Sequence, residues 1–372
     1  MPQRPLSAVV LAAGEGTLMR STRPKPLHRL CGRPMILHVL DALAELPVHR
    51  VVVVVGHRGE WVTKTLVDHA PRSLAIEFVE QASQVGTGDA LAVGLTALPD
   101  PEGIDHDDGD VVVLPGDTPL VRPPTLAALV RHHRTADAAA TLLTAVLPDP
   151  AGYDRVVRGK DDTVVRVVED AEAAGDDALV DEVATAIHCF RHSVLAPALR
   201  RLHPVPGTGE HSLTGIYAVL HDAGYRVESL LLADPMEAAG VNDRAQLAVA
   251  EAELRDRINE RWMRRGVTMW DPERTYVDAE TRLEPDVVLL PGVVLQGECT
   301  LRSGAEVGPD SHLVDSVVGR DAKVTKSTVV RAEVGDDARV GPFAVLGPGA
   351  RVPEGEVVGP FSRLGADSAA LD

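Results

Sequence analysis

The fold of the first half of the chain is decided by the stretch Leu11-Ala12-Ala13-Gly14-Glu15-Gly16-Thr17-Leu18-Met19. The apolar run at residues 8–12 predicts a buried strand, and the glycines predict a tight loop directly after that strand. Backbone N–H groups in such a strand–loop–helix junction can bind a phosphate. A nucleotide is therefore the first hypothesis for this loop. The alternative is an ordinary turn, because short glycine motifs recur by chance.

The composition is that of a globular protein with a sizeable core. The 372 residues include 45% hydrophobic and 25% charged residues, and the net charge is −18. This acidic balance argues against nucleic acid or an anionic membrane surface as partner, because both need clustered Lys and Arg. The cysteines Cys31, Cys189 and Cys299 are isolated, so the sequence indicates neither a disulfide framework nor a zinc site. No apolar stretch of about 20 residues occurs, and we expect a cytoplasmic protein.

Residues 1–242 are expected to form a Rossmann-like α/β domain with a mostly parallel sheet. The unbroken valine run at 51–55 is typical of a strand covered on both faces. Ligands of such sheets bind at the carboxyl ends of the strands, where the glycine-rich loop would lie. The pattern predicts strands at 8–12, 51–55, 76–79, 111–114, 141–146, 164–168, 184–190 and 227–231, and helices that include 35–46, 87–97, 125–133 and 213–222.

Residues 243–266 are expected to be a linker helix, with an apolar stripe on one side. Residues 267–372 then change to a period of six, which is typical of the hexapeptide repeat of a parallel β-helix. We expect roughly five coils, with a structural or oligomerising role. The repeat is carried by Val277, Leu283, Leu289, Leu295, Leu301, Val307 and Leu313, and, after a shift, by Val334, Val340, Leu346, Val352, Val358 and Leu364.

Four further motifs of the first domain are candidates for chemistry. The amide of Gln81, in a polar turn before a helix, can donate to and accept from a pyrimidine edge. Asp117 follows the predicted strand at 111–114, where a cation bound to phosphate would need it. Glu169 could accept hydroxyl hydrogen bonds from a sugar. Asn242 offers a second oxygen ligand, although it or Asp243 could instead be the N-cap of the long helix.

In this order, the motifs resemble the bifunctional N-acetylglucosamine-1-phosphate uridyltransferase/glucosamine-1-phosphate acetyltransferase family, within the sugar-1-phosphate nucleotidyltransferases. The resemblance extends from about residue 6 to about residue 364. It implies a Mg²⁺-dependent transfer from UTP to a sugar 1-phosphate, and a left-handed β-helix through which the chain forms a homotrimer. It implies the following roles: Lys25 and Asp117 are catalytic; Leu11, Ala12, Gly14, Gln81, Gly86 and Thr87 bind the nucleotide; Gly116, Glu169 and Asn242 bind the substrate; and Asp117 with Asn242 binds Mg²⁺.

The chain also departs from the family pattern. The family has Arg at Leu18 and usually a basic residue at Glu15. In the sugar pocket, Asp154 replaces a glycine and Ala184 replaces an asparagine. A charge-assisted hydrogen bond contributes ~1.5–3 kcal/mol, so loss of a bidentate Arg would slow transfer by roughly a hundredfold or more. Arg20 or Arg23 could replace the positive charges that the family has at Leu18 and Glu15. In a separate departure, Pro115 stands where the family usually has a tyrosine.

Three functions therefore stay open. The first is an active nucleotidyltransferase that uses UTP or another nucleoside triphosphate with N-acetylglucosamine 1-phosphate or a related sugar phosphate. The second is a nucleotide-binding paralogue with impaired catalysis and a regulatory role, and the third is a structural partner in a β-helix oligomer. We expect no acetyl transfer, because Val345 and Gly347 occupy the arginine-bearing segment of the resembled family and residues 361–364 lack its paired lysines.

Overall fold

The computed structural model of the chain describes residues 4–98, 108–160, 162–205 and 209–365. The chain divides into two compact units, of which the first comprises Met1–His28 and Pro34–Leu247, and the second comprises Arg29–Arg33 and Ala248–Asp372. The long helix α7 (Arg244–Met263) begins in the first unit and continues into the second. Among the helices that the structure describes, none is long and apolar enough to span a membrane.

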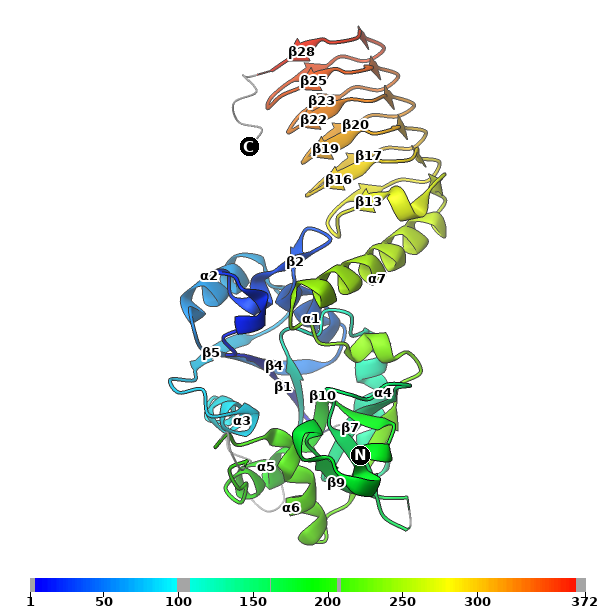
Figure 1. Cartoon of the computed structure of the whole chain (residues 1–372). Helices are drawn as coiled ribbons and strands as arrows, with labels where there is room; N and C mark the ends of the chain where they lie inside the picture. The colour runs from blue at the N-terminus through cyan, green and yellow to red at the C-terminus, as the bar shows by residue number, and fades with distance from the viewer. Residues whose placement is uncertain (1–3, 99–107, 161, 206–208, 366–372) are drawn as a thin grey trace. The chain divides into compact units, whose positions relative to one another are not determined.

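A nine-stranded mixed sheet forms the centre of the first unit, in the order β11-β7-β10-β6-β1-β4-β5, with β8 and β9 attached to β10 (Figure 1). Pairing is parallel between β1 and β4, β1 and β6, β4 and β5, and β7 and β11. The predicted mostly parallel sheet is confirmed, but β10 runs antiparallel to both β6 and β7. The strands are β1 (Leu6–Ala12), β4 (Val48–Val55), β5 (Ile76–Glu80), β6 (Asp110–Pro115), β7 (Ala140–Val146), β8 (Arg155–Arg158), β9 (Val164–Val168), β10 (Glu182–Arg191) and β11 (Val227–Leu231).

Helices cover both faces of this sheet, which explains its unbroken valine runs. Along β1, Ala8 and Val10 belong to the core shared with α1, α2 and α4, whereas Val9 between them belongs to the core shared with α3, α5 and α6. Because successive side chains of a strand point to opposite faces, both faces must be apolar. The helices are α1 (Met35–Ala44), α2 (Gly59–His69), α3 (Thr87–Leu95), α4 (Pro123–Thr135), α5 (His192–Leu199) and α6 (Ile216–Asp222).

The second unit is a parallel β-helix, preceded by most of α7. Its three sheets stack strand upon strand, as Figure 1 shows. Residues 29–33 join this unit: Cys31 N donates a 2.8 Å hydrogen bond to Glu251 Oε2, and Cys31 O accepts one of 2.9 Å from Ala279 N. These residues include the short strand β2 (Arg29–Leu30) and the first residue of β3 (Arg33–Pro34), with which β2 pairs.

The three sheets of the β-helix contain six, six and five strands within the described residues. The first is formed by β12 (Thr268–Met269), β15 (Val288–Leu289), β18 (Glu306–Val307), β21 (Lys323–Val324), β24 (Arg339–Val340) and β27 (Val357–Val358). The second is formed by β13 (Tyr276–Val277), β16 (Val294–Gln296), β19 (His312–Val314), β22 (Thr328–Val330), β25 (Val345–Leu346) and β28 (Arg363–Leu364). The third is formed by β14 (Arg282–Leu283), β17 (Thr300–Leu301), β20 (Val317–Val318), β23 (Glu333–Val334) and β26 (Arg351–Val352).

The shift in the six-residue series has a simple structural origin. The stack continues through Val318, Val324 and Val329, all of them fully buried. Leu313 stacks on Val329, and Val318 stacks on Val334, so these coils are shorter than three full hexapeptides. Each coil has three sides, one for each sheet. Where a side is one residue shorter than six, the aliphatic side chains stay in the core, but their spacing in the sequence no longer follows the period of six.

Candidate active site

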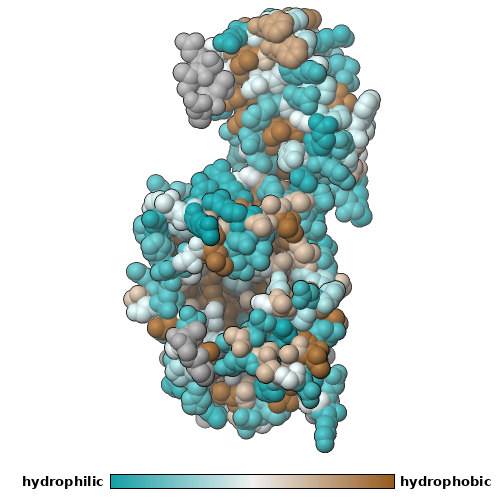
Figure 2. Space-filling model, viewed as in Figure 1, coloured by the Kyte–Doolittle hydropathy of each residue, from teal (hydrophilic) through white to brown (hydrophobic). Residues whose placement is uncertain are grey.

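A cavity of about 510 Å³ opens at the carboxyl end of the parallel strands in the first unit. Figure 2 shows this unit hollowed on the face in view, with hydrophobic residues inside and hydrophilic residues around the rim. A second cavity of about 430 Å³ adjoins the first, because six residues line both. The shared residues are Pro115, Asp117, Asp154, Ala184, Thr185 and Ala186.

The glycine-rich loop forms one rim of the larger cavity. Leu11 and Gly14 line it, and a 2.8 Å hydrogen bond from Gly116 N to Leu11 O joins the end of β1 to the end of β6. Ala12 and Gly116 line neither cavity. The Ala12 side chain belongs to the core on the opposite face, and a Cβ on Gly116 would lie 3.2 Å from Ile36 Cδ1.

Three predicted site residues from distant parts of the chain converge beside these cavities. The Lys25 ammonium pairs with the Asp117 carboxylate and donates a 2.7 Å hydrogen bond to Asn242 Oδ1. Lys25 lies in the short helix η2 (Lys25–Leu27), Asp117 follows β6, and Asn242 precedes α7. Gly16 brings the loop close to Lys25: its φ is +63°, and a Cβ there would lie 2.6 Å from Lys25 Cβ.

Asn242 is free to point toward Lys25 because its neighbour caps the helix. Asp243 Oδ1 accepts a 2.8 Å hydrogen bond from Gln246 N, which is an N-cap bond to the first turn of α7. Gln246 Oε1 in turn accepts a 2.7 Å hydrogen bond from Asn242 N. Of the two residues considered as the helix cap, Asp243 therefore has that role, and the Asn242 side chain extends toward the site.

The oxygen atoms of Asp117 and Asn242 fit one hard cation. Both contact the same ammonium group, so both can reach one positive charge. Among the described residues there is no group of three or more His, Cys, Asp or Glu side chains placed to hold a metal ion. Two protein oxygens form only part of a coordination shell, which fits Mg²⁺, a cation that usually keeps waters and takes phosphate oxygens as ligands.

Gln81 and Thr87 line another side of the larger cavity, away from Asp117. Gln81 Nε2 donates hydrogen bonds of 2.7 Å to Asp89 Oδ2 and 3.3 Å to Gly86 O. The amide N–H groups are thus used within the protein, and the carbonyl oxygen of Gln81 stays available as an acceptor. Thr87 Oγ1 accepts a 2.9 Å hydrogen bond from Leu213 N. Both residues line the cavity.

Gly86 and Gln84 complete this side. Gly86 lines the cavity with a φ of +110°, and a Cβ there would lie 2.5 Å from His211 O. The close backbone approach predicted at Gly86 is therefore made by the protein's own chain at His211. Gln84 also lines the cavity, and its Nε2 donates a 2.6 Å hydrogen bond to Ala13 O.

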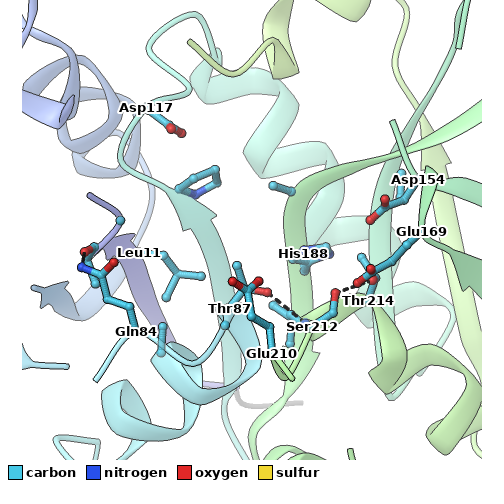
Figure 3. Close-up of a pocket in the computed structure, with 18 of the residues that line it drawn as sticks. Leu11, Gln84, Thr87, Asp117, Asp154, Glu169, His188, Glu210, Ser212 and Thr214 are labelled. Atoms are coloured by element: carbon cyan, nitrogen blue, oxygen red, sulfur yellow. Dashed lines mark hydrogen bonds between the residues drawn. The ribbon is translucent and has the colours of Figure 1, made fainter. Parts of the chain in front are cut away.

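The far wall of the cavity carries two carboxylates and a buried histidine, and Figure 3 shows Asp154, Glu169 and His188 on this wall. Burial raises the pKa of the Asp154 carboxyl, and the charge of nearby Glu169 raises it further. His188 is 2% exposed, and burial lowers its pKa to about 3. Its Nδ1 lies 2.6 Å from the hydroxyl of Tyr217, so the ring is held in a neutral, fixed orientation.

The loop residues that depart from the family pattern are exposed. The Leu18 side chain is 67% exposed, and Glu15 also faces solvent. The guanidinium groups of Arg20 and Arg23 are on the same exposed loop, with no hydrogen-bond or ion-pair partner among the residues that the structure describes. No described Lys or Arg lines either cavity.

Sequence reasoning missed several lining residues because their types are unremarkable in a loop or strand. His188 lies within the predicted strand at 184–190 as a histidine between Ile187 and Cys189, and that was the one signal available. Ser212 and Thr214, joined by a 2.8 Å hydrogen bond between their hydroxyls, reach the cavity from the segment before α6. Their segment comes close because Gly88 N donates a 2.8 Å hydrogen bond to His211 O, a pairing that no local pattern indicates.

Known proteins similar to this chain share both of its parts. The family model of the MobA-like NTP transferase domain matches residues 8–223. A protein of Streptomyces avermitilis, described as "Bifunctional protein GlmU", is 43% identical over 359 residues, which are 96% of this chain and 73% of that protein. Proteins with the same description from Pelotomaculum thermopropionicum and Desulfitobacterium hafniense are 42% and 40% identical, with 96% of this chain and 76% of each relative covered.

Proposed function

Because this chain belongs to the family of the bifunctional GlmU proteins and has their nucleotidyltransferase domain, we propose that it couples UTP to a sugar 1-phosphate. The products would be a nucleotide sugar and pyrophosphate. The sugar phosphate would be N-acetylglucosamine 1-phosphate or a related one, and another nucleoside triphosphate could replace UTP. The observation that carries this proposal is the convergence of Lys25, Asp117 and Asn242 beside a cavity at the carboxyl ends of parallel strands.

The reaction makes modest chemical demands on these residues. A sugar-1-phosphate oxygen is anionic at neutral pH and can attack the α-phosphorus of the nucleotide without a strong general base, while pyrophosphate leaves. Asp117 and Asn242 would hold Mg²⁺, which would neutralise charge that develops on the phosphate oxygens. Lys25 would contact a phosphate, and the glycine-rich loop would hold the triphosphate by backbone N–H groups, so the protein supplies position and charge.

The remaining predicted residues take their proposed roles from their place around the cavity. Leu11, Gly14, Gln81 and Thr87 line the part proposed for the nucleotide. Ala12 and Gly86 would act through the backbone. Gly116 would position Asp117, because it comes directly before it and packs on Ile36. Glu169 would accept hydrogen bonds from the sugar.

A second candidate is a nucleotide-binding paralogue with impaired turnover, in a regulatory or structural role. The exposure of Leu18 and Glu15, together with the lack of Lys or Arg among the described lining residues, favours it over a fully active enzyme. Both candidates require nucleotide binding. They differ in whether pyrophosphate is released.

The deciding experiment is a pyrophosphate-release assay with Mg²⁺, the four ribonucleoside triphosphates and a panel of sugar 1-phosphates. Release with one pair is the expected result, and Asp117→Ala should abolish it while leaving the circular dichroism spectrum unchanged. Exposed Asp68→Ala is the control for a lost carboxylate. Protein that binds UTP by calorimetry yet releases no pyrophosphate with any pair would rule out the transferase and establish the second candidate.

For the β-helix we propose a role in assembly, as a homotrimer, and no acetyl transfer by residues 267–365. The support is the absence of the family's basic residues around Val345 and Gly347. Incubation with acetyl coenzyme A and glucosamine 1-phosphate should yield no free thiol. Thiol release above background would overturn this proposal. A cytoplasmic location stays a prediction.

A further inference from the structure

The far wall of the larger cavity is acidic, and no described Lys or Arg side chain lines this cavity. Asp154 and Glu169 reach it from two different segments, the one before β8 and the one after β9. The Glu169 carboxylate has no hydrogen-bond or ion-pair partner among the residues that the structure describes. Asp154 Oδ1 accepts only a long hydrogen bond of 3.3 Å, from Asp170 N.

The basic side chain next to this wall is turned away and already engaged. Arg155 follows Asp154 directly, but its Nη2 donates a 3.1 Å hydrogen bond to Asp170 Oδ1, and its Nη1 bonds the carbonyl of Tyr153. Its side chain is 6% exposed and lines neither cavity. Two carboxylates that share a cavity repel each other, and a positive group between them would remove that repulsion.

A buried histidine faces the same part of the cavity. His188 lines it although only 2% of the residue is exposed. Its Nδ1 is used by the Tyr217 hydroxyl, and the described residues make no hydrogen bond to Nε2, which is therefore available to a ligand. A polar ring nitrogen held at the floor of a cavity costs free energy unless a ligand or water bonds it. This is an observation independent of the two carboxylates, and it also indicates a polar ligand.

This wall does not offer the set of ligands that a metal ion needs. Within the described residues, no three His, Cys, Asp or Glu side chains are placed to hold one. The neutral His188, with the hydroxyls of Thr185 and Thr214 on the same cavity, is suited to a ligand that presents several hydroxyl groups. An organic cation with hydroxyl groups fits this wall better than a bare cation.

We propose that the sugar phosphate taken by this cavity is an amino sugar 1-phosphate whose free ammonium group lies between Asp154 and Glu169. The inference rests on the proposed nucleotidyl transfer and adds to it the class of sugar. His188 Nε2 bonds a ring hydroxyl of the same sugar. An N-acetylated sugar presents a neutral amide to the two carboxylates and leaves their repulsion in place, so it is the weaker ligand.

The test compares three sugar phosphates that differ at one position: glucosamine 1-phosphate, N-acetylglucosamine 1-phosphate and glucose 1-phosphate. Each is titrated into the protein by calorimetry and assayed for pyrophosphate release with UTP and Mg²⁺. The amino sugar should bind about tenfold more tightly than the other two, because it gains one charge-assisted hydrogen bond. Equal or tighter binding of N-acetylglucosamine 1-phosphate overturns the inference.

Two variants locate the effect. Glu169→Gln and Asp154→Asn should each bring the ratio of the affinities for glucosamine 1-phosphate and glucose 1-phosphate close to one, whatever either variant does to the absolute affinities. Exposed Glu172→Gln, which removes the same charge nearby, should keep the preference. A preference that survives both cavity variants also overturns the inference. Pyrophosphate release with another sugar only would leave the proposed function standing, whereas selective binding without release would support the inference and refute the transferase.

Discussion

Lys25 occupies the place between two oxygen atoms that we propose as metal ligands. Its ammonium is bound to both Asp117 and Asn242, so it competes with any cation for them. We therefore expect Lys25→Met to tighten Mn²⁺ binding to the nucleotide-free protein by about tenfold, the free energy of one charge-assisted hydrogen bond. Isothermal calorimetry measures this directly.

The control for that measurement is Arg20→Met, which removes a charge from an exposed side chain on the same loop. It should leave the affinity for Mn²⁺ unchanged. If Lys25→Met binds Mn²⁺ no better than the unaltered chain, the two oxygens are not a cation site in the free protein. In that case the lysine would be a structural partner of Asp117 rather than a competitor.

His188 should make the folded state sensitive to acid. Its pKa is lowered to about 3 by burial, whereas an unfolded chain has a histidine pKa of about 6.5. Between these values the unfolded state binds more protons, so the free energy of unfolding falls with falling pH, by up to about 1.4 kcal/mol per unit. Urea unfolding at pH 7.5 and pH 5 should show the loss, and His188→Gln should reduce it.

Exposed His49 provides the comparison, because His49→Gln should keep the pH dependence of the unaltered chain. Equal slopes for His188→Gln and His49→Gln would contradict the burial argument. In the range where activity is measured, the ring stays neutral and cannot repel a positive ligand.

Individual site residues were predictable from the sequence only where a motif carried them. The sequence indicated Lys25, Asp117 and Asn242 by type and position, and the structure brings them together. It indicated neither Gln84 nor His188, because an amide in a turn and a histidine in a strand have no local signal of the cavity they face. Their role depends on which segments pack across from them, and packing is a long-range property.

At the level of elements, the first turn of α7 holds Asn242 in place. Asp243→Ala removes the oxygen that accepts from Gln246 N and should lower the free energy of unfolding by about 1 kcal/mol. It should also raise the KM for the nucleotide, because the chain at Asn242 loses its anchor. Asp243→Asn keeps the capping oxygen and should behave like the unaltered chain. Equal KM values in all three proteins would show that the cap does not position Asn242.

The six-residue repeat predicted the strands of the β-helix but not the lengths of all its coils. The six-residue period predicted parallel strands around one aliphatic core, and that is the structure. It did not predict the coils that contain Val318, Val324 and Val329, because sides shortened by one residue break the period while preserving the stack. The side chains that share the core keep the strands of successive coils aligned. The spacing between these side chains in the sequence changes at each shortened side, so a fixed period of six no longer finds them.

For the whole molecule, we expect a trimer with three times the mass of the 39.5 kDa chain. The β-helix exposes large apolar side chains that a partner copy could bury, with Trp270 70% and Phe361 75% exposed. Multi-angle light scattering measures the mass. Phe361→Ser should weaken the assembly, and exposed Arg320→Ser on the same unit should not. A monomeric mass at micromolar concentration would contradict the expected assembly.

The division of the chain into units could be predicted only in part. The change from alternating strands and helices to a six-residue period indicates two architectures and the helix between them. It cannot indicate that residues 29–33 belong to the second unit, because five residues inside the first domain have no compositional signal. Cys31 N donates to Glu251 and Cys31 O accepts from Ala279 N, and these two hydrogen bonds join residues 29–33 to the second unit across more than two hundred residues of chain.

The stacking of the β-helix has a consequence for how that unit loses its structure. Each strand pairs only with the strand one coil before and one coil after, so β19 contacts β16 and β22. Damage to one coil is therefore felt by its two neighbours and fades beyond them. Such a stack frays from an end, like a one-dimensional chain of coupled units, whereas the mixed sheet of the first unit has a shared core that melts as one.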